Sequence, residues 1–164
     1  MSKETRRDIA LIGTFFLVSA TGMASVFLGP RLLAWIVIVI SDLYLFIILL
    51  LAALRSDDES FLDRHPWAAN FFPRRTAALL LVVLLFTAVL LGFAGLYVGT
   101  EIFASTKTPL DAIYISVFTL ALTDYSPKVG YGQVVVMSEV VNGVLLIVAL
   151  FPLLISRIST FKNP

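Results

Sequence analysis

The segment from Thr108 to Gly143 reads TPLDAIYISVFTLALTDYSPKVGYGQVVVMSEVVNG. Thr108 can cap a helix, Pro109 suits its first turn, and Asp111 places a negative charge at its positive end. We expect a helix from Pro109 to about Ala121, which is too short to cross a bilayer. A polar turn and a longer apolar helix follow directly. This order is typical of a pore loop, in which non-helical backbone enters the membrane and faces water inside an assembly.

The composition around this segment indicates a membrane protein. The chain has 164 residues, of which 59% are hydrophobic and 14% charged, against about 25% charged in soluble domains. The net charge of +1 gives no reason to expect nucleic acid as a partner. There is no cysteine, and His65 is the single histidine. Because no nucleophile–base pair or metal cluster is recognisable, we expect no enzyme, no cofactor and no metal beyond permeating cations.

Four apolar segments are long enough to span a bilayer of about 30 Å. The predicted spans are Ile9–Leu28, Leu32–Leu54, Thr76–Val98 and Gln133–Arg157. The first is rich in small residues, which let helices approach closely in lipid. The sequence therefore predicts an all-α membrane protein with four transmembrane helices and a re-entrant pore helix and loop. Its predicted regions are residues 1–54 (two helices), 55–75 (a cytoplasmic or interfacial linker) and 76–164 (a pore domain).

The distribution of basic residues predicts the orientation, because Lys and Arg accumulate on the cytoplasmic side. One side would carry Lys3, Arg6, Arg7, Arg55, Arg64, Arg74, Arg75, Arg157 and Lys162, and the other only Arg31, Lys107 and Lys128. We therefore expect a multi-pass protein of the cell membrane (inner or plasma membrane) with both termini in the cytoplasm. No span carries arginine at every third position, so the first two spans do not resemble a usual voltage sensor.

Two carboxylates fall inside predicted spans, where an unpaired charge costs several kcal/mol. Asp42 lies near the middle of the second span, and no basic residue lies within any span to pair with it. It is either a group on an ion or proton pathway or a protonated side chain bonded to a neighbouring helix. Glu139 lies about two turns into the last span. We expect it to hold the pore loop from behind through the hydroxyls of Ser116, Thr119 and Thr123; the alternative is that it faces a water-filled entrance.

The segment from Arg75 to Ser159 resembles the pore region of tetrameric potassium channels. The residues that carry the resemblance are Asp111, Ala112, Tyr114, Ser116, Val117, Thr119 and Leu120 in the short helix, with Gly132 and Gly143 in the long one. The resemblance implies a homotetramer around a central pore, in contact with the lipid bilayer. It also implies that Gly143 acts as a gating hinge. Pro152, nine residues further along, would bend the same helix.

The selectivity filter of that family reads TVGYGD, and this chain departs from it. The VGYG at Val129–Gly132 is interpreted as unrelated to a filter, because its last glycine matches the residue that opens the final helix. Two registers remain, and the one at Leu122–Ser126 is favoured over Thr119–Thr123, which would shorten the pore helix. The candidate filter and pore-loop residues are Thr119, Leu120, Ala121, Leu122, Thr123, Asp124, Tyr125 and Ser126.

Neither register retains a filter glycine, so a ladder of carbonyl groups tuned to potassium is not expected. The leading hypothesis is a membrane channel for monovalent cations, K⁺ or Na⁺, with weak selectivity and a ring of Asp124 carboxylates at its mouth. One alternative is a channel-like subunit that does not conduct and has a structural or regulatory role. Another is a proton-coupled transporter that uses Asp42 and Glu139.

Overall fold

The computed structural model describes residues 2–57, 61–71, 75–100, 102–103, 108–121, 127 and 130–150. Within these residues the fold is all-helical, with no strand. The elements are α1 (Lys3–Leu28), α2 (Arg31–Asp57), α3 (Phe61–Arg64), the 3₁₀ helix η1 (Ala68–Phe71), α4 (Arg75–Thr100), α5 (Pro109–Leu120), α6 (Tyr131–Val144) and the π-helix η2 (Leu145–Leu150).

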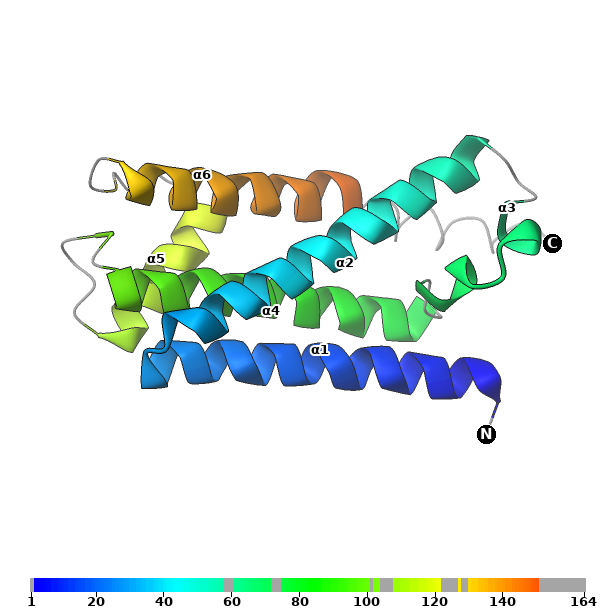
Figure 1. Ribbon diagram of the computed structural model, residues 1–164, viewed down its shortest axis with the longest axis horizontal. Helices are drawn as coiled ribbons and strands as arrows, with labels where there is room; N and C mark the ends of the chain where they lie inside the picture. Colours follow the sequence, from blue (N-terminus) through cyan, green and yellow to red (C-terminus); the bar gives the residue numbers. More distant parts are fainter. Residues whose placement is uncertain are drawn as a thin grey trace.

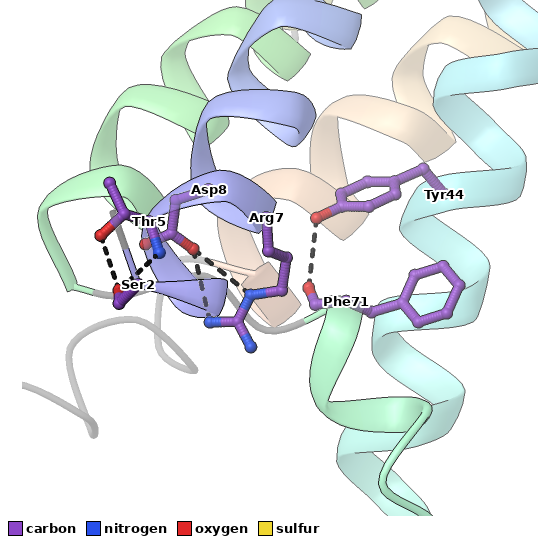
Figure 2. A network of polar contacts seen from close by, with 6 residues as sticks. All are labelled: Ser2, Thr5, Arg7, Asp8, Tyr44 and Phe71. Carbon is purple, nitrogen blue, oxygen red and sulfur yellow. Dashed lines mark hydrogen bonds and ion pairs between the residues drawn. The ribbon is translucent and has the colours of Figure 1, made fainter.

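Four of these helices are long and apolar enough to span a membrane: α1, α2, α4, and α6 together with the start of η2. This confirms the prediction of four helices long and apolar enough to span a membrane; the predicted end of the fourth, after Leu150, lies outside the described residues. The first begins earlier than predicted, at Lys3, because the Ser2 hydroxyl accepts a hydrogen bond from the Thr5 amide at 3.2 Å and caps the helix (Figure 2). At its other end, Gly29 adopts φ 79°, a left-handed conformation that glycine allows at a helix end.

Helix α4 is the centre of the bundle, because it packs against α1, α2, α5 and α6. Figure 1 shows it between α1 and α6, with α2 crossing it obliquely. Its sequence has no distinct polar face, as expected for a helix enclosed on several sides. Phe93, Leu96 and Tyr97, near its C-terminal end, are almost fully buried. This end of α4 is also where α5 packs.

Small residues bring α1, α2 and α4 into close contact. A methyl group added at Gly95 of α4 would lie 2.2 Å from the Ser25 hydroxyl of α1 and 3.1 Å from the Ala34 Cβ of α2. Added at Gly22 of α1 it would lie 2.9 Å from the Leu91 Cβ. Because the helices share no water-driven attraction inside lipid, this close fit is what holds them together.

The linker that follows α2 returns to the bundle at η1. The Tyr44 hydroxyl of α2 donates a hydrogen bond to the Phe71 carbonyl at 3.3 Å (Figure 2). The Tyr44 ring also packs on Phe15 of α1, with ring centroids 4.6 Å apart. Nearby on α1, Arg7 and Asp8 form an ion pair at 3.4 Å. The N-terminus and α3 lie at one end of the bundle, and the turn between α1 and α2 lies at the other (Figure 1).

We expect Gly95→Val to destabilise the bundle by about 1–3 kcal/mol, the usual cost of overpacking a close contact. The valine side chain would meet Ser25 and Ala34 on two different helices. Thermal unfolding in detergent measures the effect. The matched control is Gly13→Ala on α1, where a methyl group would have nothing within 4 Å; this change should be neutral or stabilise the helix by up to about 1 kcal/mol. Equal effects of the two changes would contradict the tight α1–α2–α4 interface.

Candidate functional site

The short helix α5 begins as the sequence predicts. The Thr108 hydroxyl accepts a hydrogen bond from the Asp111 amide at 3.2 Å, and the Asp111 carboxylate accepts one from the Thr108 amide at 2.9 Å. This reciprocal pair is a capping box, which fixes the helix start. The helix has 12 residues, so its length is about 18 Å at 1.5 Å per residue. It cannot cross a hydrocarbon core of about 30 Å.

A buried polar cluster joins α5 to the two spanning helices beside it. Glu139 of α6 is 0% exposed. One of its carboxyl oxygens shares a hydrogen bond with the Ser116 hydroxyl of α5 at 2.5 Å, and the other accepts one from the Tyr97 hydroxyl of α4. A single side chain therefore connects three helices. Figure 1 shows α5 between α4 and α6, at the end of the bundle where α6 begins.

The hydrogen atoms in this cluster can be counted. The Ser116 hydroxyl also lies 2.9 Å from the Leu90 carbonyl of α4. Two hydroxyl protons, from Tyr97 and Ser116, thus face three acceptor oxygens: both carboxyl oxygens of Glu139 and the Leu90 carbonyl. A protonated Glu139 completes the set, because it can donate to Ser116, which donates in turn to Leu90, while Tyr97 donates to the second carboxyl oxygen. A neutral acid also avoids placing an unpaired charge in a dry site.

The hydrogen bond from Ser116 to Glu139 confirms one contact predicted from the sequence. Thr119, a second expected donor, is buried near Tyr97 but makes no hydrogen bond of good geometry. Thr123, the third, lies outside the described residues. The Tyr97 contact was not predicted. Its signal was a tyrosine hydroxyl in a strongly apolar span, but the pairing requires knowing which face of α4 meets α6.

The region proposed as a filter is described only at its beginning. Thr119 and Leu120 are helical and buried, and Ala121 is the C-terminal cap of α5. A filter in the Thr119–Thr123 register would need non-helical backbone at Thr119 and Leu120. Because both residues belong to α5, the structure favours the register at Leu122–Ser126. Residues 122–126, including Asp124, lie outside the described residues, and the filter stays a prediction.

Gly130, Tyr131 and Gly132 of the VGYG sequence form the N-cap and the first residues of α6, which agrees with the interpretation that this sequence is unrelated to a filter; Val129 lies outside the described residues. Gly130 adopts φ 86° and precedes α6, and Tyr131 and Gly132 already belong to that helix. Gly132 then packs closely on Ile102, whose side chain would lie 3.0 Å from an added methyl group. Glycine is therefore needed here for the turn and for helix packing.

Gly143, predicted as a hinge, lies where α6 crosses the end of α5. A methyl group added there would approach the Leu120 carbonyl to 3.2 Å and the Leu120 side chain to 3.1 Å. The π-helix η2 begins two residues later, at Leu145. Local π-helix is a recognised cause of helix bending. Pro152 lies outside the described residues, so the hinge itself stays a prediction.

Asp42 lies in a separate place from Glu139. It lines an open groove of about 670 Å³ between α2 and α6, together with Ser138 and Asn142. Its carboxylate interacts with the Asn142 side chain, while its Oδ1 atom is buried without a hydrogen-bond partner. Asp42 therefore contacts protein, as expected of a carboxylate within a span. Glu139 instead faces α4 and α5, so these contacts do not place the two acids in one site.

The described helices define a class of protein: an all-helical, membrane-embedded protein with a short, anchored helix packed between two of its spanning helices. Comparison with protein-family models, curated proteins and solved structures finds no match for this chain. Among the described residues, no group of three or more His, Cys, Asp and Glu side chains could hold a metal ion.

We expect Glu139→Gln to be mild and Glu139→Leu to be severe. Glutamine keeps a donor toward Ser116 and an acceptor for Tyr97, as a neutral glutamic acid does. Leucine leaves the buried Tyr97 hydroxyl without its acceptor, at about 1–3 kcal/mol, while the Ser116 hydroxyl keeps only the Leu90 carbonyl. Unfolding in detergent measures both variants. Gln133→Leu is the matched control, because Gln133 is an exposed polar residue of the same helix. Equal destabilisation by Gln and Leu at position 139 would rule out the bridging role.

Proposed function

We propose that this protein is a subunit of a membrane channel for monovalent cations. The pore would be formed by α6 and by the re-entrant segment that consists of α5 and the residues after it. The observation that carries the proposal is the anchored short helix: α5 is too short to span, is capped at its start, and is fixed by Glu139 against two spanning helices. A helix held in this way supports irregular backbone at membrane depth, which occurs only inside protein or beside water.

The direction of α5 supports a preference for cations. Its capped N-terminus carries the positive end of the helix dipole, so its C-terminus at Leu120 carries the negative end. The residues that follow include Asp124, the acid predicted to form a ring at the pore mouth. A negative helix end followed by a carboxylate attracts cations and repels anions. The missing filter glycines argue against strong discrimination between K⁺ and Na⁺.

The exposed faces of α5 and α6 support assembly around an axis. Leu110, Tyr114 and Val117 are exposed on α5 at spacings of three or four residues, and so share one face. Large apolar residues on α6 are exposed at similar spacings. One chain supplies one re-entrant segment. In an assembly with closed rotational symmetry, the re-entrant segments of several copies would surround a shared pore. The proposed assembly is a homotetramer in the cell membrane with both termini in the cytoplasm.

A channel-like subunit without conduction would share the same anchored helix, and only a measurement of current separates it from the channel. The transporter alternative receives less support, because Asp42 and Glu139 contact different helices rather than one common pocket.

Reconstituted into planar bilayers, the purified protein should carry a cation current whose reversal potential differs little between K⁺ and Na⁺ gradients. Asp124→Asn should reduce permeability to cations relative to anions, since it removes the carboxylate ring. Asp8→Asn is the control, because this acid pairs with Arg7 near the start of α1 and should leave selectivity unchanged.

Two results would contradict the channel proposal. One is a silent bilayer that contains protein shown to be correctly folded and assembled, which would favour the non-conducting subunit. The other is a stable monomer in lipid nanodiscs by mass measurement, since one re-entrant segment cannot enclose a pore. A reversal potential that follows K⁺ alone would overturn the expected weak selectivity.

A further inference from the structure

The segment from α3 to η1 reaches the boundary of the apolar layer. The Phe71 carbonyl of η1 accepts a hydrogen bond from Tyr44 (Figure 2), and the Tyr44 ring packs on Phe15 of α1. Phe15 lies six residues beyond Ile9, where the apolar part of α1 begins, and is therefore about 9 Å inside the apolar layer at 1.5 Å per residue. Phe71 thus lies close to the level at which α1 passes from the headgroups into the hydrocarbon. Trp67, which lies between α3 and η1 in the chain, packs edge-on against Phe71 with ring centroids 6.4 Å apart.

Residues 61–71 are folded against the bundle rather than extended. The His65 amide donates to the Phe61 carbonyl, and the Ala68 amide donates to the His65 carbonyl, both at 2.9 Å. The His65 ring contacts the rings of Phe61 and Trp67, with centroids 4.8 and 6.3 Å apart. Ala68 is 0% exposed, whereas Trp67 is 54% exposed. The segment therefore packs one side on the bundle and presents, on the other, a tryptophan held by neighbouring rings.

The exposed side of this segment combines an aromatic ring with N–H donors. Trp67 carries an indole N–H, and Arg64 and Asn70, which carry further N–H groups, are also exposed. Water would hydrate the apolar surface of the indole ring at a cost in free energy, and hydrocarbon would leave the N–H groups without acceptors. The headgroup layer suits both, because phospholipids present phosphate and ester oxygens as acceptors next to an apolar interior. Tryptophan is accordingly enriched at this level in membrane proteins.

We propose that residues 61–71 form an interfacial anchor, which lies in the phospholipid headgroup layer with Trp67 inserted between the lipids. The exposed side of the segment is thus covered by lipid, and not by water or by a second protein. The anchor is joined to α2 by the hydrogen bond from Tyr44, and it leads into α4, which begins four residues after Phe71. It therefore holds the start of the central helix at a fixed depth. The anchor does not depend on the proposed pore, and it remains testable if the protein does not conduct.

Tryptophan fluorescence of the full-length protein in phosphatidylcholine vesicles tests this position. The chain has two tryptophans, so Trp35→Phe leaves Trp67 as the single emitter. Phosphatidylcholine with bromine near the carbonyl end of its acyl chains should quench Trp67 at least twofold more strongly than lipid with bromine near the chain ends. Acrylamide in the water should quench Trp67 at least twofold less than it quenches free N-acetyltryptophanamide.

The matched control places a tryptophan deeper in the membrane. Phe46 is 63% exposed near the middle of α2. In protein with Trp35→Phe and Trp67→Phe, the additional change Phe46→Trp should give an emitter that the deeper bromine quenches more strongly. If Trp35→Phe does not fold, the Trp67 signal is the emission of the unchanged protein minus that of Trp67→Phe.

Three results would overturn the anchor. Acrylamide quenching equal to that of the free amide, without quenching by bromine, would show that the segment lies in water. Stronger quenching of Trp67 by the deeper bromine, as for Phe46→Trp, would place the ring in the hydrocarbon. Protection of Trp67 from both acrylamide and bromine would show that protein covers the ring.

Discussion

The position of α5 depends on a carboxyl group that is shielded from solvent. Glu139 is in contact with α4 through Tyr97 and with α5 through Ser116. A helix of 12 residues has little of its own to keep it in place, because isolated helices of this length are marginally stable. The hydrogen bonds of Glu139 fix the position of α5 because they are directional, whereas apolar packing is not. The close contact of Gly143 with Leu120 also brings α6 near the end of α5. Helices α5 and α6 are therefore held together both by close packing and by the hydrogen bond between Ser116 and Glu139.

The other half of the bundle is held by a different means. Between α1, α2 and α4 the close contacts are made by glycine, alanine and serine, which meet one another and the side chains of Val37, Ile38 and Leu91. The Ser25 hydroxyl bonds to the Gly22 carbonyl of its own helix at 2.7 Å. This interface has a close fit, and the Ser19 hydroxyl of α1 donates a hydrogen bond across it to the Leu84 carbonyl of α4 at 3.1 Å. Helix α4 takes part in both arrangements, with its small residues toward α1 and α2 and its Tyr97 hydroxyl toward α6. It therefore contacts both the first two helices and the polar cluster around Glu139.

The sequence allowed the helices to be placed well, since length, apolar content and caps are local properties. The start of α5 follows from Thr108, Pro109 and Asp111, and the structure reproduces it. The bond from Ser116 to Glu139 could also be predicted, because depth in the membrane can be estimated from the distance to each helix end. What could not be predicted depended on helix rotation: the Tyr97 bond, the pairing of Gly95 with Ser25, and the approach of Asn142 to Asp42 all require knowing which faces meet.

The π-helix η2 allows the chain to lose one residue without a change in the direction that its helix faces are turned. A π turn contains one more residue than the α turn it replaces, so the loss of a single residue between Leu145 and Leu150 can be absorbed by conversion to α-helix. The same loss between Gly132 and Gly143 would rotate one end of α6 by about 100° relative to the other. Glu139 and Gly143 would then no longer face the same neighbours. The loss of one residue should therefore be tolerated in η2 and not in α6, although both belong to one span.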